Sequence, residues 1–152
     1  MAEFNAPQVT GVAVAPGVRY SPFRRAGTIT RLFRWRWWGP TIRSQPYPDA
    51  GWCTWNDSVK AEPQKHWICP QAGYVDAQGM LWIVDPAAPG LKFTVPGGPK
   101  LVKTDPTTGR SAPDYSLPRG VAPRHSYLND VRIDLQNNPM PTSPTPVPAR
   151  WS

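Results

Sequence analysis

The sequence predicts a mainly β protein: a small β-sandwich, meander or partial barrel core with little helix, flanked by long extended proline-rich N- and C-terminal arms. The 152 residues include 21 prolines and 12 glycines, so these two types make up 33 of 152 residues, or about 22 %. Their average combined share is about 12 %, and both types interrupt helices. Eight Trp, five Tyr and four Phe argue against disorder, because disordered chains are poor in aromatic residues. The apolar runs between the prolines and glycines are short, as is typical of strands.

Residues 1–27 are predicted to form an extended N-terminal arm. Proline or glycine recurs about every five residues along it, which is too frequent for a helix. Valine and alanine alternate in residues 12–15, a pattern that fits a strand better than a helix. The run 9–15 is therefore suited to pairing with the edge of a sheet, including a sheet that belongs to a neighbouring chain.

Residues 28–38, TITRLFRWRWW, are the strongest predicted strand. They are β-branched and aromatic, and no glycine or proline interrupts them before Gly39, as favours a strand. Because successive side chains of a strand point to opposite faces, one face carries Ile29, Arg31, Phe33, Trp35 and Trp37. The other face carries Thr28, Thr30, Leu32, Arg34, Arg36 and Trp38. Neither face suits open solvent, so we expect both to be covered.

Residues 28–103 are predicted to form the core, and short apolar runs are densest from residue 50 onward. The polar residues 76–79 stand between two such runs, which predicts a hairpin turn that ends at Gly79. We expect a further short strand over residues 91–95. One helical turn is expected within residues 58–65, where a proline keeps it short.

Residues 104–152 are predicted to form an extended C-terminal arm. Residues 127–138 are one further candidate strand, since Val131, Ile133 and Leu135 alternate with charged residues. Residues 139–148 contain five prolines in ten positions, which favours the polyproline II conformation.

The positive charge is concentrated in one part of the chain. Between Glu3 and Asp49 there are seven arginines and no acidic residue, so this part carries all of the formal net charge of +7. The remainder has ten basic and ten acidic residues, and every lysine lies at position 60 or later. Such a segment suits an acidic partner.

The two cysteines, Cys53 and Cys69, leave three alternatives open. We favour two thiols in a small core. A disulfide between them would stabilise the fold by about 3 kcal/mol. A metal site with Cys53, His66 and Cys69 would need a fourth ligand such as Asp57, and the spacing matches no common zinc pattern.

The sequence shows no constellation that indicates catalysis. It contains neither a phosphate-binding P-loop nor a dinucleotide-binding glycine motif, and its aspartates are scattered singly, several beside Pro or Gly, where aspartate usually makes turns. A thiol–imidazole pair of Cys53 or Cys69 with His66 is the enzymatic alternative. We predict that the chain is not an enzyme and has no catalytic residue, metal site or cofactor.

The Arg- and Trp-rich strand 28–38 admits several interpretations. Arginines on phosphate with tryptophans stacked on bases would bind nucleic acid, although residues 19–43 contain no lysine. Two other interpretations are a platform that binds carbohydrate or a cell surface, and a ladder of Arg–Trp contacts inside the chain. We favour a protein interface, because Trp and Arg are the types most enriched at interface hot spots. The candidate partner-binding residues are Arg31, Phe33, Arg34, Trp35, Arg36, Trp37, Trp38, Arg150 and Trp151.

These patterns predict a non-enzymatic structural or accessory subunit of a large assembly, whose arms link neighbouring subunits. The specific hypothesis is a virion protein: a tailed-bacteriophage capsid decoration, cement or head–tail accessory protein, assembled in the host cytoplasm. Its partners would be protein subunits, either copies of this chain or a major shell protein with an acidic surface. The alternative is a nucleic-acid-binding accessory protein that uses residues 19–43.

The sequence indicates neither secretion nor membrane insertion. The first 20 residues lack a basic start followed by a long apolar run, so we expect no secretory signal. No run approaches the roughly 20 apolar residues that span a bilayer. We therefore expect no membrane partner, no small-molecule substrate, and a cytoplasmic location outside any virion.

Overall fold

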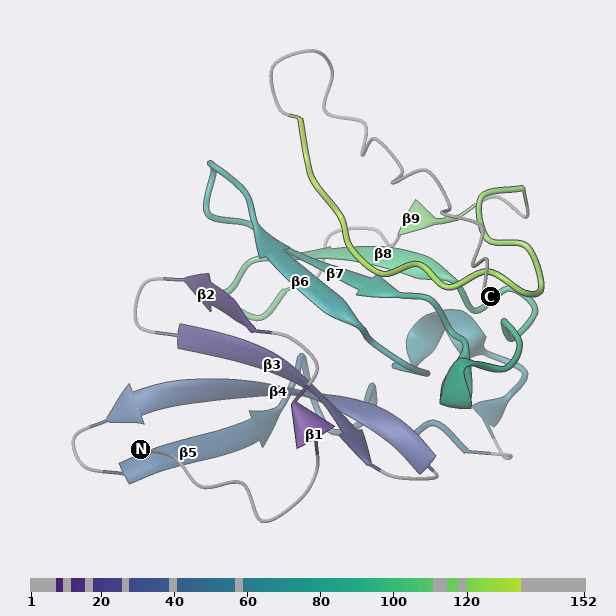
Figure 1. Cartoon of the computed structure of the whole chain (residues 1–152). Helices are drawn as coiled ribbons and strands as arrows, with labels where there is room; N and C mark the ends of the chain where they lie inside the picture. The colour runs from purple at the N-terminus through teal and green to yellow at the C-terminus, as the bar shows by residue number, and fades with distance from the viewer. Residues whose placement is uncertain are drawn as a thin grey trace.

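The computed structural model describes residues 8–9, 12–15, 18–25, 28–38, 41–56, 59–110, 115–117 and 120–134. Side chains are described in residues 12–15, 45–56, 59–110, 117 and 120–134. Within these ranges the chain forms nine strands in two antiparallel sheets and two short 3-10 helices (Figure 1). The mainly β class predicted from the sequence is confirmed.

The first sheet contains β1 (Gln8–Val9), β2 (Ala13–Ala15), β3 (Val18–Arg25), β4 (Thr28–Trp38) and β5 (Thr41–Pro46). β3, β4 and β5 follow one another as a meander, while β1 and β2 both pair with β3. β4 has the bounds that the sequence predicts, because its β-branched and aromatic run favours a strand. The described part of the expected N-terminal arm is thus paired into a sheet, and β3 joins β4 across the expected boundary at residue 27.

The second sheet contains β6 (Ala72–Val75), β7 (Leu81–Asp85), β8 (Lys100–Thr104) and β9 (Tyr115–Ser116), in this spatial order. The turn between β6 and β7 is the hairpin predicted from residues 76–79. The Asp76 amide donates to the Met80 carbonyl, and the Gly79 amide donates to the Asp76 carbonyl, both at 2.9 Å. The Asp76 carboxylate also accepts from the amide of Gln78 at 2.9 Å and the indole of Trp82 at 2.8 Å, so one aspartate fixes both the turn and a core tryptophan.

Gly79 offers a test of this turn. Its φ is 80°, and a Cβ built on it would meet nothing within 4 Å, so the cost of Gly79→Ala is backbone strain alone. We expect a loss of about 1 kcal/mol in the free energy of unfolding, measured by urea denaturation. Gly120→Ala is the matched control: that position is equally open but lacks the left-handed backbone, so a similar loss there would contradict the strain explanation.

Buried side chains cover both faces of β7, and all five of its residues are buried. Leu81 and Ile83 belong to the cluster that faces the first sheet, which also includes Ala13 of β2. Trp82 and Val84 point to the opposite face, as the alternation of a strand requires. That second cluster is closed by Leu101, Leu128, Val131 and Ile133.

Two expected strands are corrected by the structure. Residues 91–95 contain no strand: the 3-10 helix η3 (Pro89–Leu91) ends there, and Gly90 and Leu91 have φ values of 69° and 61°, which a strand does not contain. Residues 127–134, the described part of the candidate strand 127–138, also form none. They cross the face of the second sheet (Figure 1), so their alternation reflects burial on one side and not strand pairing.

The single helical turn expected within residues 58–65 is confirmed as the 3-10 helix η2 (Pro63–Lys65). Proline at its start keeps the preceding residue, Glu62, outside helical backbone, and the chain is extended again at His66. η2 lies beside the buried polar network described below, to which the Pro63 carbonyl contributes an acceptor.

Candidate protein interface

The pairing register shows which face of β4 points toward the core. Residues directly opposite one another in an antiparallel pair share a face of the sheet. Ala13 is opposite Tyr20, and Tyr20 is opposite Arg34. Ala13 and Ala15 are each only 5 % exposed, and a Cβ on Gly73 of β6 would lie 3.1 Å from the Ala13 Cβ. The inward face of β4 is therefore the one that carries Leu32, Arg34, Arg36 and Trp38.

The opposite face of the first sheet points outward. Val14 is opposite Arg19, and Arg19 is opposite Trp35. Val14 is 59 % exposed and its neighbour on the same face, Val12, is 56 % exposed. The strand period of two places the other odd-numbered residues of β4 on this face. We call it the outward aromatic face: Val14, Arg19, Phe23, Arg31, Phe33, Trp35, Trp37 and Ile42.

The two faces of the sheet have different cover. On the inward face, Tyr47 immediately after β5 is fully buried in the cluster that joins the two sheets. Gln45 lies on the same face, opposite Arg34, and is exposed at the edge strand, so the inward cover is incomplete at β5. On the outward face, the Val14 side chain of β2 is exposed to solvent. Exposed apolar side chains on a sheet face suit a binding partner.

The sheet separates the candidate partner-binding residues into two groups. Arg31, Phe33, Trp35 and Trp37 are brought together on the outward aromatic face, whereas Arg34, Arg36 and Trp38 lie on the inward face. Their positions follow from the backbone register. Arg150 and Trp151 lie outside the described residues. The outward group therefore forms the candidate interface.

The two cysteines are not joined in a disulfide. Cys53 and Cys69 are buried thiols in different clusters. The Cys53 Sγ donates to the Tyr47 carbonyl at 3.9 Å, and the Cys69 Sγ donates to the Ala88 carbonyl at 3.5 Å. His66 instead contacts the Gly51 carbonyl through Nδ1 at 3.0 Å. The favoured alternative of two core thiols is the one that the structure shows. Asp57 lies outside the described residues, and within those residues no three metal-ligating side chains cluster.

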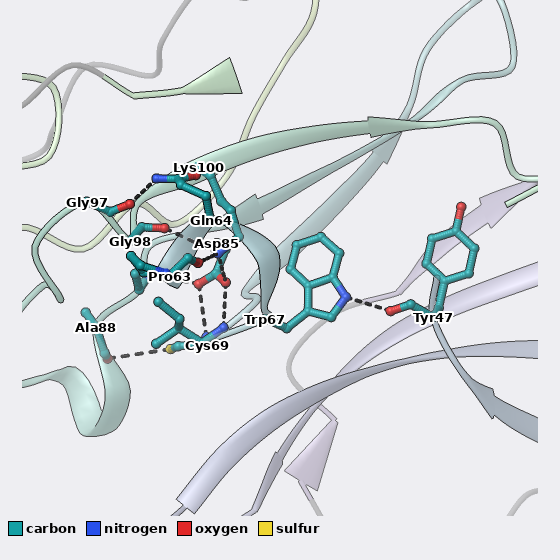
Figure 2. A network of polar contacts seen from close by, with 12 residues as sticks. Tyr47, Pro63, Gln64, Trp67, Cys69, Asp85, Ala88, Gly97, Gly98 and Lys100 are labelled. Carbon is teal, nitrogen blue, oxygen red and sulfur yellow. Dashed lines mark hydrogen bonds and ion pairs between the residues drawn. The ribbon is translucent and has the colours of Figure 1, made fainter. Parts of the chain in front are cut away.

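Sequence reasoning missed a buried polar network centred on Asp85 and Lys100 (Figure 2). Both side chains are 0 % exposed, and the Lys100 Nζ lies 3.0 Å from the Asp85 Oδ2. Lys100 donates its other protons to the carbonyls of Pro63 at 3.1 Å and Gly98 at 3.3 Å. The Asp85 carboxylate also accepts three backbone amides, those of Ile68 at 2.7 Å, Cys69 at 3.0 Å and Ala87 at 2.8 Å.

This network is structural, because its charges are satisfied internally and closed to solvent. A catalytic group must reach its substrate, whereas Asp85 and Lys100 have no exposed surface. The only sequence signal was the position of Asp85 before a proline, which predicts a turn. Asp85 does accept the amide of Ala87 two residues later, but the turn reveals nothing about Lys100.

No protein-family model matches this chain, and no curated protein matches it. Within the described residues, no helix has both the length and the apolar character needed to cross a bilayer.

Proposed function

We propose that this chain is a non-enzymatic structural or accessory subunit of a large assembly, which it joins through the outward aromatic face. The observation that carries the proposal is the register, which groups Phe33, Trp35 and Trp37 with the exposed Val14, opposite the buried alanines of β2. A group of large rings flanked by arginines on one face of a sheet has the composition of an interface hot spot.

The size of this face fits a specific protein contact. A large aromatic side chain can bury roughly 200 Å², so Phe23, Phe33, Trp35 and Trp37 together could contribute at most about 800 Å². A standard interface buries about 800 Å² on each partner. At about 25 cal/mol per Å², burying one such ring contributes up to about 5 kcal/mol to the binding free energy, before the entropy cost of ordering is subtracted. A few well-packed rings are therefore enough to hold the subunit in place.

Charge favours an acidic protein partner. The outward aromatic face includes Arg19 and Arg31, and the region between Glu3 and Asp49 contains no acidic residue, so two copies meeting through this face would repel each other. Arginine pairs with carboxylates through two parallel hydrogen bonds and stacks on aromatic rings. We assign the partner as a protein subunit with an acidic, grooved surface.

A virion protein is the specific form of this proposal: a tailed-bacteriophage capsid decoration, cement or head–tail accessory protein. Proline-rich segments lose little conformational entropy on docking, because their φ angles are already restricted. Repeated copies around a symmetric shell would add multivalency to each contact. A tryptophan-rich β core with proline-rich flanks suits such a linking role.

The test is the double variant Trp35→Ala/Trp37→Ala. We expect it to lose incorporation into the assembly, measured by co-sedimentation of the tagged chain with particles from the cells that produce it. Arg31→Glu should weaken incorporation as well, because it opposes an acidic partner. Trp38→Ala is the control: it lies on the inward face, so its effect should be on stability. Normal incorporation of the double variant would contradict the proposal.

A salt titration separates this function from nucleic-acid binding. If all seven arginines contacted phosphates, the logarithm of the binding constant would fall with the logarithm of salt concentration with a slope of about −6. If the chain binds DNA or RNA with such a slope and moderate salt releases it, the partner is a nucleic acid and not a protein.

A further inference from the structure

The second sheet has a different kind of cover on each of its two faces. On the face toward the first sheet, Ile83 of β7 and Val102 of β8 are directly opposite each other and pack in the cluster that joins the two sheets. On the other face, the opposite pair Val84 and Leu101 is covered by residues 127–134, which we call the strap (Figure 1). The strap contains no strand, so its cover does not depend on strand pairing.

Three buried apolar side chains anchor the strap on the sheet: Leu128, Val131 and Ile133. Within the described residues, no hydrogen bond joins the backbone of these three anchors to the second sheet. By contrast, β7 is paired along its whole length with β6 on one side or β8 on the other. A segment held by side chains can leave its support without breaking a ladder of backbone hydrogen bonds. Its opening therefore costs less free energy than the unfolding of the sheet.

The polar contacts between the strap and the sheet lie at β6, an edge strand. The side-chain amide of Gln71, the residue before β6, donates to the Asn129 Oδ1 at 3.3 Å and accepts from the Tyr127 hydroxyl. The Arg132 guanidinium carbon lies 5.5 Å from the ring centroid of Tyr74 in β6. Asn129 and Arg132 are exposed, so water can replace their contacts when the strap moves.

The turn that precedes the strap is fixed by backbone groups and provides a pivot. The Thr94 amide donates to the Arg124 carbonyl at 3.0 Å, and the Thr94 hydroxyl donates to the Pro123 carbonyl at 3.4 Å. The Ser126 amide and hydroxyl donate to the same Pro123 carbonyl, at 2.9 Å and 2.8 Å. These bonds all lie before residue 127, so a movement of the strap leaves the turn in place.

We propose that the strap is a removable cover, which swings away from the second sheet about residues 123–126 while both sheets stay folded. Opening exposes Trp82, Val84 and Leu101 together. The Lys103 Nζ lies 5.1 Å from the Trp82 ring centroid, so the uncovered face carries a cation beside its largest ring. An apolar face of this kind suits a binding partner. The strap thus controls access to a second surface, on a different sheet from the outward aromatic face.

The test compares thiol reactivity on the two faces of β7 in the full-length chain. Val84→Cys places a thiol under the strap, and Ile83→Cys places one under the first sheet. These positions are 3 % and 1 % exposed, so iodoacetamide reaches either thiol only through an opening of the fold. Peptide mass spectrometry follows the alkylation, and each rate is divided by that of the same variant in urea. Cys53, a buried thiol between the sheets, is the internal reference.

We expect position 84 to react faster than position 83 by roughly tenfold or more, and position 83 to react as slowly as Cys53. Leu101→Cys and Val102→Cys repeat the comparison on β8, where the same two faces are opposite. The result therefore does not depend on one variant folding. Equal rates on the two faces would overturn the proposal, because the cover would then open only with the whole fold.

Removing an anchor shows whether the strap itself controls this access. Leu128→Ala, added to Val84→Cys, should raise the rate at position 84 by roughly tenfold and leave the rate of Ile83→Cys unchanged. Asn129→Ala is the matched control: it removes an exposed contact of the same segment, so it should change the rate by less than about twofold. Equal acceleration of both faces by Leu128→Ala would also contradict a separate opening of the strap.

Discussion

Replacing Lys100 with methionine is expected to lower the free energy of unfolding by about 3–5 kcal/mol. Lys100 and Asp85 are fully buried and joined at 3.0 Å. Methionine fills much of the same volume but leaves the Asp85 carboxylate as an uncompensated charge in the core, which is far more costly than losing an exposed ion pair. Urea denaturation, monitored by tryptophan fluorescence, measures the loss.

Lys65→Met is the control for this prediction. Lys65 pairs with Glu62 in the same way, but the two side chains are 69 % and 54 % exposed. Exposed pairs contribute between about 0 and 1 kcal/mol, so we expect only a small change. If Lys100→Met were also nearly neutral, the buried charge of Asp85 would have to be compensated by another group, and the structural role assigned to the pair would be wrong.

Asp85→Leu should destabilise the fold more than Lys100→Met. Asp85 accepts three backbone amides besides the lysine, from residues 68, 69 and 87. Each buried donor that loses its acceptor costs about 1–3 kcal/mol. The double variant Asp85→Leu/Lys100→Met removes both charges and should be less destabilised than the sum of the single variants. Additive losses would show that the two charges do not interact.

Elements defined by local patterns could be predicted from the sequence. β4 and the turn between β6 and β7 were expected at residues 28–38 and 76–79, because an unbroken β-branched run and a polar interruption ending in glycine are signals within about ten residues. The same local reasoning failed at residues 91–95 and 127–134. At residues 91–95, left-handed backbone at Leu91 is incompatible with a strand. At residues 127–134, the alternation comes from burial against the second sheet without strand pairing.

Long-range pairings could not be predicted, because nothing local encodes them. The strand period separates the residues of β4 into two faces but does not show which of them points inward. That direction follows only from the pairing of the buried Ala13 with Tyr20, and of Tyr20 with Arg34. Likewise, Lys100 is fifteen residues from its partner Asp85, and the Arg124 guanidinium lies 4.9 Å from the ring centroid of the distant Phe93. Each of these contacts depends on how loops bring distant residues together.

Trp67→Ala is expected to have the second large effect, a loss of about 3–5 kcal/mol in the free energy of unfolding. Trp67 is fully buried and lies between the two sheets. Its indole donates to the carbonyl of Tyr47, the residue after β5, at 2.6 Å, and its ring lies 5.8 Å from the Lys100 Nζ of β8. Figure 2 shows the ring placed between Tyr47 and the Asp85–Lys100 network. Its removal leaves a cavity at the junction.

The effect should be directional, because Trp67 joins the sheet that carries the outward aromatic face to the rest of the core. Amide hydrogen exchange of β3, β4 and β5 should accelerate more than that of β7 and β8, which keep the cluster of Trp82 on their other face. Trp67→Phe keeps a ring but loses the indole donor, so it should cost only about 1–2 kcal/mol. Uniform acceleration in both sheets would show that they unfold as one unit and that Trp67 is not a separate junction.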